Sequence, residues 1–320
     1  MKRLIAPLLL AVAGLPQAPA GTTQAPPDTE IYLASLTRAN GSFRIGPPEN
    51  ITNSPGYDNQ PFFTPDNRAI LFTSIRGPSP GLRPESGPQT DIYRYDIASR
   101  TVSRVTQTAE SEYSPTVMPD GTRISVVCVE ADGTQRLWSV APSGPKIERA
   151  VLLPDVPRVG YHAWADDHTL ALFVLGEAGL VSTLQLADTR TGKARIVASD
   201  VGRSIQPIPG PGRVHHISFV QRERRGTATV LAIRELDPAS GAISTLTPAI
   251  EGSTEPYVAW TPDGTLLTVN GSFLFSWRRG QSGWKEAASL EQLGLSGITR
   301  LAVSPRGDYL ALVASSSRTR

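Results

Sequence analysis

Residues 113–129 read YSPTVMPDGTRISVVCV, and this stretch decides the fold. Pro119-Asp120-Gly121 predicts a tight turn, because an aspartate side chain can bond its own backbone and glycine accepts a positive φ at little cost. The run from Ile124 to Val129 is almost wholly apolar, which is typical of a strand buried on both faces. The stretch therefore predicts a short strand, a tight turn and a buried strand.

Turns of this kind recur along the whole chain, with first residues 54, 47, 45, 51 and 43 positions apart. They begin at Thr64, Met118, Ala165, Gly210, Thr261 and Ser304. Each turn is preceded by a short strand pattern and followed by an apolar one, and most are followed by two more, such as 91–95 and 102–106. Four strands in each period of 43–54 residues are typical of a propeller blade.

Six turns predict an all-β fold, a six-bladed β-propeller of four-stranded antiparallel blades. The sixth repeat runs out after Val313, because only residues 314–320 remain. Residues 30–36 and 43–45 match the missing third and fourth strands, joined by a turn at Asn40-Gly41. We therefore expect N-terminal strands to complete the C-terminal blade and close the ring, since an open ring would expose strand edges. The alternative is a stray N-terminal hairpin beside five and a half blades.

The first 20 residues have the features of a secretory signal peptide. Lys2 and Arg3 precede an apolar stretch at 4–15, and the small residues Ala18 and Ala20 favour cleavage near Ala20. The apolar stretch is too short to span a bilayer, which takes ~20 residues. We therefore expect a periplasmic or secreted protein with no transmembrane segment in its mature chain. A flexible leader at 21–29, a propeller at 30–315 and a disordered tail at 316–320 complete the predicted organisation.

Composition narrows the classes of partner. The chain has 31 Lys and Arg against 29 Asp and Glu, and the predicted signal peptide holds two of the cations, Lys2 and Arg3. Such a balanced charge gives no reason to expect nucleic acid as a partner. The chain has one cysteine, Cys128, which excludes an intrachain disulfide and a multi-cysteine metal site. We expect no cofactor.

Two repeats share a longer motif, in which a proline and an aromatic residue precede Thr-Pro-Asp. In the first of these repeats, Asp-Ile-Tyr follows later. These residues lie at 60–67 with 91–93 and at 255–264. The motif resembles the repeat of TolB-like, WD40-like propellers, and the resemblance covers residues 30–315, a propeller domain only. It implies the propeller fold strongly and a function only weakly, because such positions build turns and blade packing.

Candidate binding residues follow from the expected geometry. The first strand of each blade lines the central channel of a propeller, so the upstream ends of these strands form one mouth. The polar and aromatic residues at those ends are Asp58, Asn59, Glu112, Tyr113, Tyr161, His162, Arg203, Glu255, Tyr257 and Arg300. The long loop Arg76–Thr90 is expected on the same face, where it either arches over the mouth or forms a surface insertion. The basic stretch 221–226 is expected to be a loop between strands on the channel-mouth face, as part of a solvated hairpin.

These groups support two functional hypotheses of different classes. Acidic, basic and aromatic groups at one mouth suit recognition of a protein or peptide. The first hypothesis is therefore an exported, non-enzymatic, monomeric propeller with a partner in the bacterial cell envelope, for instance a peptidoglycan-associated lipoprotein. The alternative is a channel-mouth enzyme, a metal-dependent lactonase or a polysaccharide lyase, that uses His162 with nearby carboxylates. A further alternative is that the polar groups merely solvate a water-filled channel.

Overall fold

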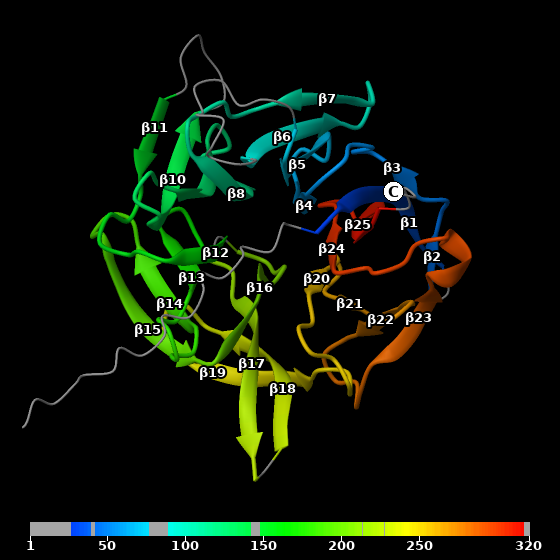
Figure 1. The fold of residues 1–320 in the computed structure, drawn as a ribbon. Helices are drawn as coiled ribbons and strands as arrows, with labels where there is room; N and C mark the ends of the chain where they lie inside the picture. The colour runs from blue at the N-terminus through cyan, green and yellow to red at the C-terminus, as the bar shows by residue number, and fades with distance from the viewer. Residues whose placement is uncertain are drawn as a thin grey trace, which may run out of the picture.

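The computed structural model describes residues 27–316 except 40–41, 77–88, 142–147, 213 and 227. Within these residues, six antiparallel sheets stand around a central axis and form a six-bladed β-propeller (Figure 1). The predicted fold class and blade number are confirmed. Several other predictions lie outside the described residues: the signal peptide, most of the leader, most of the Arg76–Thr90 loop and residues 317–320 of the tail.

Five blades are each formed by four strands that are consecutive in the chain and adjacent in the sheet. Blade 1 comprises β4 (Asp58–Phe63), β5 (Ala69–Ser74), β6 (Asp91–Asp96) and β7 (Thr101–Arg104). Blade 2 comprises β8 (Ser111–Val117), β9 (Ile124–Val129), β10 (Gln135–Ala141) and β11 (Glu148–Val151). Blade 3 comprises β12 (Val159–Trp164), β13 (Thr169–Val174), β14 (Thr183–Asp188) and β15 (Lys193–Ser199).

Blades 4 and 5 continue the same order. Blade 4 comprises β16 (Val201–Pro207), β17 (Ile217–Arg225), β18 (Ala228–Leu236) and β19 (Ile243–Pro248). Blade 5 comprises β20 (Val258–Trp260), β21 (Leu266–Asn270), β22 (Phe273–Trp277) and β23 (Lys285–Ser289). A short 3-10 turn, η2 (Glu291–Leu293), then leads toward the last blade.

Blade 6 is built from both ends of the chain. Its sheet order is β24 (Arg300–Val303), β25 (Tyr309–Ser315), β1 (Thr29–Ala39) and β2 (Ser42–Ile45). β1 runs antiparallel to β25 with Ile31 opposite Val313, so the predicted ring closure is confirmed. A single fourth strand was expected at the outer edge of this blade. The edge instead has two strands, because β3 (Glu49–Asn50) pairs with β1 in addition to β2. β1 is long enough for its two halves to take separate outer partners.

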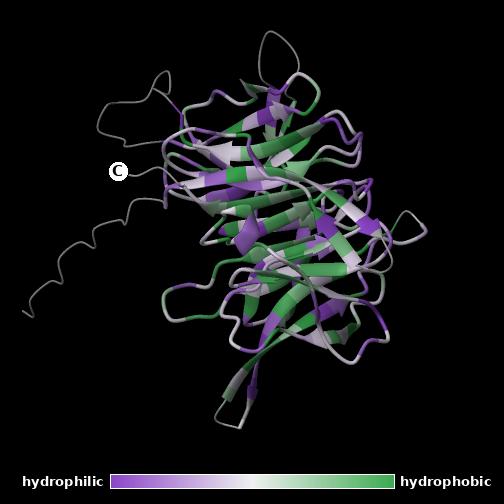
Figure 2. Cartoon of the chain, turned by 90° about the vertical axis from the view of Figure 1, so that its right-hand side faces the viewer, coloured by the Kyte–Doolittle hydropathy of each residue, from purple (hydrophilic) through white to green (hydrophobic). Residues whose placement is uncertain are grey.

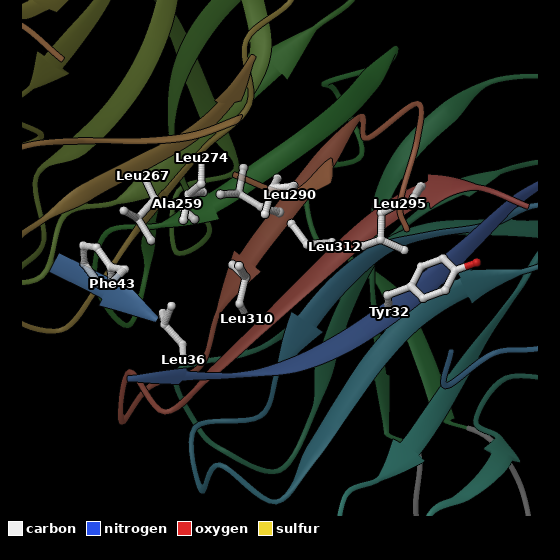
Figure 3. Packing of buried hydrophobic residues seen from close by; sticks show 12 residues of the cluster. Tyr32, Leu36, Phe43, Ala259, Leu267, Leu274, Leu290, Leu295, Leu310 and Leu312 are labelled. Carbon is white, nitrogen blue, oxygen red and sulfur yellow. The ribbon is translucent and has the colours of Figure 1, made fainter. Parts of the chain in front are cut away.

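The hydrophobic core lies between neighbouring blades. Each buried cluster among the described residues joins side chains from two adjacent blades. Figure 3 shows the cluster between blades 5 and 6, where Leu267 and Leu274 pack near Leu310 and Leu312. β5 is buried along its whole length, as the apolar pattern of the second strands predicts. One blade cannot bury both of its faces, so neighbouring blades stabilise each other.

Two junctions between blades share a specific contact. Trp164 Nε1 donates to Ser125 Oγ at 3.0 Å, and Trp260 Nε1 donates to Ser218 Oγ at 2.8 Å. Each tryptophan ends an inner strand, and each serine lies on the second strand of the preceding blade. The contact satisfies a buried indole N–H and joins blade 2 to blade 3 and blade 4 to blade 5.

Residues 221–225 belong to a strand and not to the expected loop, and Gly226 lies in the turn of the hairpin. β17 continues to Arg225 and pairs with β18, and the resulting hairpin projects from the edge of the ring (Figures 1 and 2). The expectation was wrong because it weighed only the charge run. The pairing strand β18 contributes Thr229 and Val230 opposite Arg224 and Glu223, and β-branched residues favour strand pairing.

Candidate functional site

A cavity of about 580 Å³ opens where the inner strands begin, and we call it the upstream cavity. Residues from blades 1, 3, 4, 5 and 6 line it. Its charged, phenolic and amide side chains are Asp28, Tyr57, Asn59, Tyr161, Arg203, Glu255, Tyr257, Asn270 and Arg300. Six of the ten predicted site residues are in this set. The upstream ends of the inner strands therefore meet at one mouth.

Arg300, the first residue of β24, packs between tyrosines from two other blades. Its Cζ lies 4.0 Å from the ring centre of Tyr257 and 5.0 Å from the ring centre of Tyr161. Its Nη2 donates to Tyr161 Oη at 2.6 Å. A guanidinium within about 6 Å of an aromatic ring is attracted by the ring's electrons. Blades 3 and 5 thus hold the guanidinium of blade 6 in a fixed position.

The three tyrosines around Arg300 differ in acidity. Burial raises the pKa of Tyr57 and of Tyr257 well above the ordinary value, although Arg300 acts in the opposite direction. Burial would also raise the pKa of Tyr161, but Arg300, a hydrogen bond with Gln60 and the charge of Arg203 together lower it. Tyr161 accepts the hydrogen bond from Arg300 at its phenol oxygen.

Glu255 forms one side of the upstream cavity and is held by two groups. One carboxylate oxygen accepts the backbone N–H of Arg203 at 2.9 Å, and the other pairs with Arg222 Nη2 at 2.6 Å. Within the described residues, no carboxylate forms an ion pair with Arg203 or Arg300. Two guanidiniums of the mouth, those of Arg203 and Arg300, are therefore not paired with the carboxylates of the same lining.

A second cavity, of about 350 Å³, shares Tyr161, Arg203, Tyr257 and Arg300 with the upstream cavity. We call it the inner cavity. Because the four shared side chains line both spaces, they lie between two compartments of the channel. A ligand that enters from the upstream mouth meets these four residues before it reaches the inner cavity.

Four inner strands carry a register shift beside the inner cavity, and those of β4 and β8 hold a residue with positive φ. Gln60 and Ser114 have φ angles of 57° and 53°, a region that residues other than glycine rarely adopt. Ser114 N–H donates to Gln60 Oε1 at 2.8 Å, and Thr73 Oγ1 donates to the same oxygen at 2.7 Å. Such backbone conformations persist where the surroundings fix them. Here the bulges tie blades 1 and 2 together next to Tyr161.

The opposite mouth of the channel has a different lining. A cavity of about 710 Å³ opens there, beside the tight turns of the repeat, and none of the ten predicted site residues lines it. Its larger apolar residues and prolines are Pro61, Phe62, Phe63, Pro207, Pro209, Pro211, Trp260, Pro262 and Pro305. The acidic Asp263 in its wall pairs with Arg38 and Arg278. Turn-forming residues therefore dominate this mouth.

Two predicted carboxylates are buried and do not line the upstream cavity. Asp58 is 1% exposed and pairs with Arg76 Nη2 at 3.2 Å, and burial raises its pKa to about 6. Glu112 accepts hydrogen bonds from the hydroxyls of Thr106 and Thr108, and burial raises its pKa to about 7. Successive strand residues point to opposite faces, so Asp58 and its cavity-lining neighbour Asn59 cannot both face the channel.

His162 lies at the junction between blades 2 and 3. Its Nε2 is 2.6 Å from Ser125 Oγ, and burial lowers the pKa of the imidazole to about 3, so the ring is neutral. It borders the inner cavity, which neither Asp58, Glu112 nor Glu255 lines. The structure therefore does not bring His162 together with these carboxylates. Tyr113, the remaining predicted residue, packs against the hydrophobic cluster between the same two blades.

Sequence reasoning missed Asp28, Tyr57 and Asn270 of the cavity lining, and Arg222, which pairs with Glu255 behind it. Tyr57 lines the upstream cavity and directly precedes β4, so an aromatic residue before an inner strand was the available signal. Arg222 gave no such signal, because it comes from the second strand of its blade. Within the described residues, no group of three His, Cys, Asp or Glu could hold a metal ion. No helix in the same part of the chain is both long and apolar enough to cross a membrane.

No family model and no curated protein gives a significant match to this sequence. Solved structures do match. TolB from Acinetobacter baumannii matches with a TM-score of 0.53 and 16% identity over 92% of this chain, which spans 66% of that protein's chain. A TolB candidate from Agrobacterium tumefaciens matches with a TM-score of 0.63 and 13% identity, covering 91% of this chain and 99% of that one.

A propeller outside the TolB group is similar as well. A chain in the crystal structure of a nidogen–laminin complex matches with a TM-score of 0.56 and 14% identity, covering 91% of this chain and all of that one, 100%. At such low identities the likeness is one of fold. The protein has the six-bladed propeller fold, and TolB-like propellers are among the structures that share it.

Proposed function

We propose that the protein is an exported, non-catalytic propeller that binds a protein or peptide segment at the upstream mouth of its channel. The observation that carries the proposal is the lining of the upstream cavity, where Tyr57, Tyr161 and Tyr257 surround Arg300. Tyrosine and arginine are enriched at the centres of protein interfaces and among the residues that contribute most to binding. A preorganised group of this composition suits a segment inserted from the partner.

The cavity's position also suits this function. Five blades hold its residues at or near the ends of rigid strands, so binding costs little ordering of the site. The tyrosine rings provide apolar contact area, and the phenol and guanidinium groups provide directional hydrogen bonds. The site can therefore combine shape and polarity in recognising an extended segment.

The proposed location and partner follow from the sequence pattern. The signal-peptide features of residues 1–20 support export to the periplasm or beyond. The TolB-like propellers among the fold neighbours support a partner in the bacterial envelope. A peptidoglycan-associated lipoprotein is one partner of this kind, bound by a monomeric propeller.

Two tryptophan substitutions, one at each mouth of the channel, test the proposal. Thr254 is exposed at the upstream cavity and Gly210 is exposed at the opposite mouth, so each can be replaced by tryptophan without disturbing the core. Peptides selected by the wild-type protein from a displayed random library are then titrated against Thr254→Trp and Gly210→Trp. We expect the first variant to weaken binding by about tenfold or more, which is roughly 1.4 kcal/mol, and the second to leave it unchanged. Enrichment of no peptide, or equal effects of the two variants, would contradict the proposal.

A further inference from the structure

The guanidinium of Arg300 has N–H donors that are not used in hydrogen bonds to side chains of the described residues. A guanidinium has five N–H donors, and within the described residues its hydrogen bond to a side chain is the one to Tyr161. Aromatic contacts with Tyr161 and Tyr257 offset part of the cost of removing the charge from water. They supply no negative charge, however. An anion that entered the cavity would meet a charge already oriented and partly desolvated.

The acidic groups of the upstream cavity are engaged elsewhere. Glu255 is held by Arg222 and by the backbone of Arg203. Asp28 accepts the backbone N–H of Gly56 at 3.1 Å. Arg203, whose side chain also lines the cavity, adds a second positive charge beside Arg300. Asp28 still adds a negative charge to the lining, so the preference for a ligand with negative charge is local to Arg300 and Arg203, which have no carboxylate partner among the described residues.

The planar guanidinium favours a particular kind of anion. Its parallel N–H groups match the two oxygens of a carboxylate, and hydrogen bonds between charged partners are shorter and stronger than neutral ones. The hydroxyl of Tyr57 lines the same cavity and keeps its proton, so it can donate to a carboxylate as well. The walls between these groups include Pro27 and Pro256, which suit the apolar parts of a peptide.

We propose that the upstream cavity recognises a carboxylate on the bound peptide, with Arg300 as the anchor and Arg203 as a second cation. The inference rests on the proposed function, since it names the chemical group by which the peptide is recognised. The carboxylate is either the chain terminus or an aspartate or glutamate side chain.

Four matched peptide arrays distinguish these sources. Random octapeptides are prepared with a free C-terminal carboxylate or a C-terminal amide, and each set either contains or lacks aspartate and glutamate. The full chain is applied to all four arrays. We expect the amidated set without acidic residues to bind about tenfold more weakly, or worse, than the sets that carry a carboxylate. The strongest set identifies the source of the carboxylate.

Arginine variants link this preference to the cavity. We expect Arg300→Gln to lose the carboxylate preference and Arg203→Gln to reduce it by a few fold. Arg203 is exposed, so its variant keeps the test valid even if Arg300→Gln fails to fold. Arg190→Gln is the matched control, because Arg190 is exposed at a turn of blade 3 and pairs with Asp188. We expect it to bind all four arrays as the wild type does.

The outcomes separate the two proposals. If the wild type binds neutral and acidic peptides equally well and Thr254→Trp abolishes both, peptide binding at the mouth stands and carboxylate recognition fails. If no array binds, the proposed function fails and this inference with it. If polygalacturonate displaces the acidic peptides and binds more tightly than any of them, the recognised carboxylate belongs to a sugar, and the peptide proposal is overturned.

Discussion

The junction between blades 2 and 3 and the junction between blades 4 and 5 share one contact but differ in the polar group beside it. In both, a tryptophan donates to a serine of the preceding blade. Two residues before the tryptophan, the first junction has His162 and the second has Val258, and both side chains are buried. The shared position thus fixes a tryptophan–serine contact, while the neighbouring position accepts either an imidazole or an isopropyl group.

The same blades differ at a second pair of equivalent positions. Glu112 and Glu255 each stand six residues before the turn of their blade. Glu112 lies within β8, opposite Cys128, and is buried. Glu255 precedes β20, because Pro256 has no N–H to donate to a strand ladder, and it reaches the upstream cavity. At this pair of positions, the residue inside the strand is enclosed and the residue ahead of the strand lines the cavity.

The largest expected effect comes from making the first junction resemble the second with His162→Val. The pKa of His162 is lowered from 6.5 to about 3, so the neutral ring contributes stability above pH 6.5 that is lost as the pH falls toward 3. At pH 4 the wild-type protein has lost about 3 kcal/mol of unfolding free energy because the buried ring of His162 stays neutral. We expect the variant to lose correspondingly less unfolding free energy between pH 7 and pH 4, measured by denaturant titration.

The serine of this junction should tolerate that change. In the second junction, Ser218 Oγ donates to the carbonyl oxygen of Gln206 at 3.2 Å, and Ser125 Oγ has an equivalent carbonyl, that of Thr116, at 3.4 Å. The variant can therefore be less stable at pH 7 and still show the flatter pH profile. Parallel profiles for variant and wild type would show that His162 does not contribute to acid sensitivity.

Glu112→Gln should change the free energy of unfolding at high pH, whereas His162→Val changes it at low pH. We expect the change to be slightly smaller. The pKa of Glu112 is raised from 4.5 to about 7, so its contribution to stability is present below pH 4.5 and is lost as the pH rises through 7. The amide keeps the shape of the side chain and cannot ionise. We expect the variant to be more stable than the wild type at pH 8 by on the order of 2 kcal/mol, and to lose this advantage at pH 4.5. An equal difference at both pH values would refute the assignment.

Glu255→Gln, at the equivalent position of blade 5, should have the smallest effect on stability. Its ion pair with Arg222 is partly exposed, and such pairs contribute roughly 0–1 kcal/mol. We expect a change below about 1 kcal/mol in the free energy of unfolding, measured under the same conditions. A loss as large as that of a core substitution would mean that Glu255 supports the blade and not only the cavity wall.

The sequence predicted those parts of the fold that depend on local chemistry. The six recurring turns predicted the number of blades, and the shortage of residues after Val313 predicted the ring closure. The sequence did not predict the local backbone irregularities that set the direction of individual side chains. Gln60 and Ser114 sit at bulges with positive φ, and no pattern of residue types predicts such a bulge within an otherwise regular strand.

The candidate site was predicted in part for the same reason. Residues on inner strands could be assigned to the channel, but strand alternation and burial decide which of them line it. Asp58 and Glu112 were expected at the mouth, whereas their side chains are enclosed. Arg222 reaches Glu255 from a hairpin that is distant in sequence, so only the folded blade brings the two together.

The closure of blade 6 by both ends of the chain has a practical consequence. Pro27 and Ser315 both border the upstream cavity, and Thr29 pairs with Ser315. A bulky label attached at Pro27 or at Ser315 would therefore stand beside the opening and hinder whatever enters it. A cysteine introduced at Ile196, which is 60% exposed on the outer strand β15, offers a better handle. The native Cys128 would not compete for the label, because it is buried and burial raises its pKa to about 12.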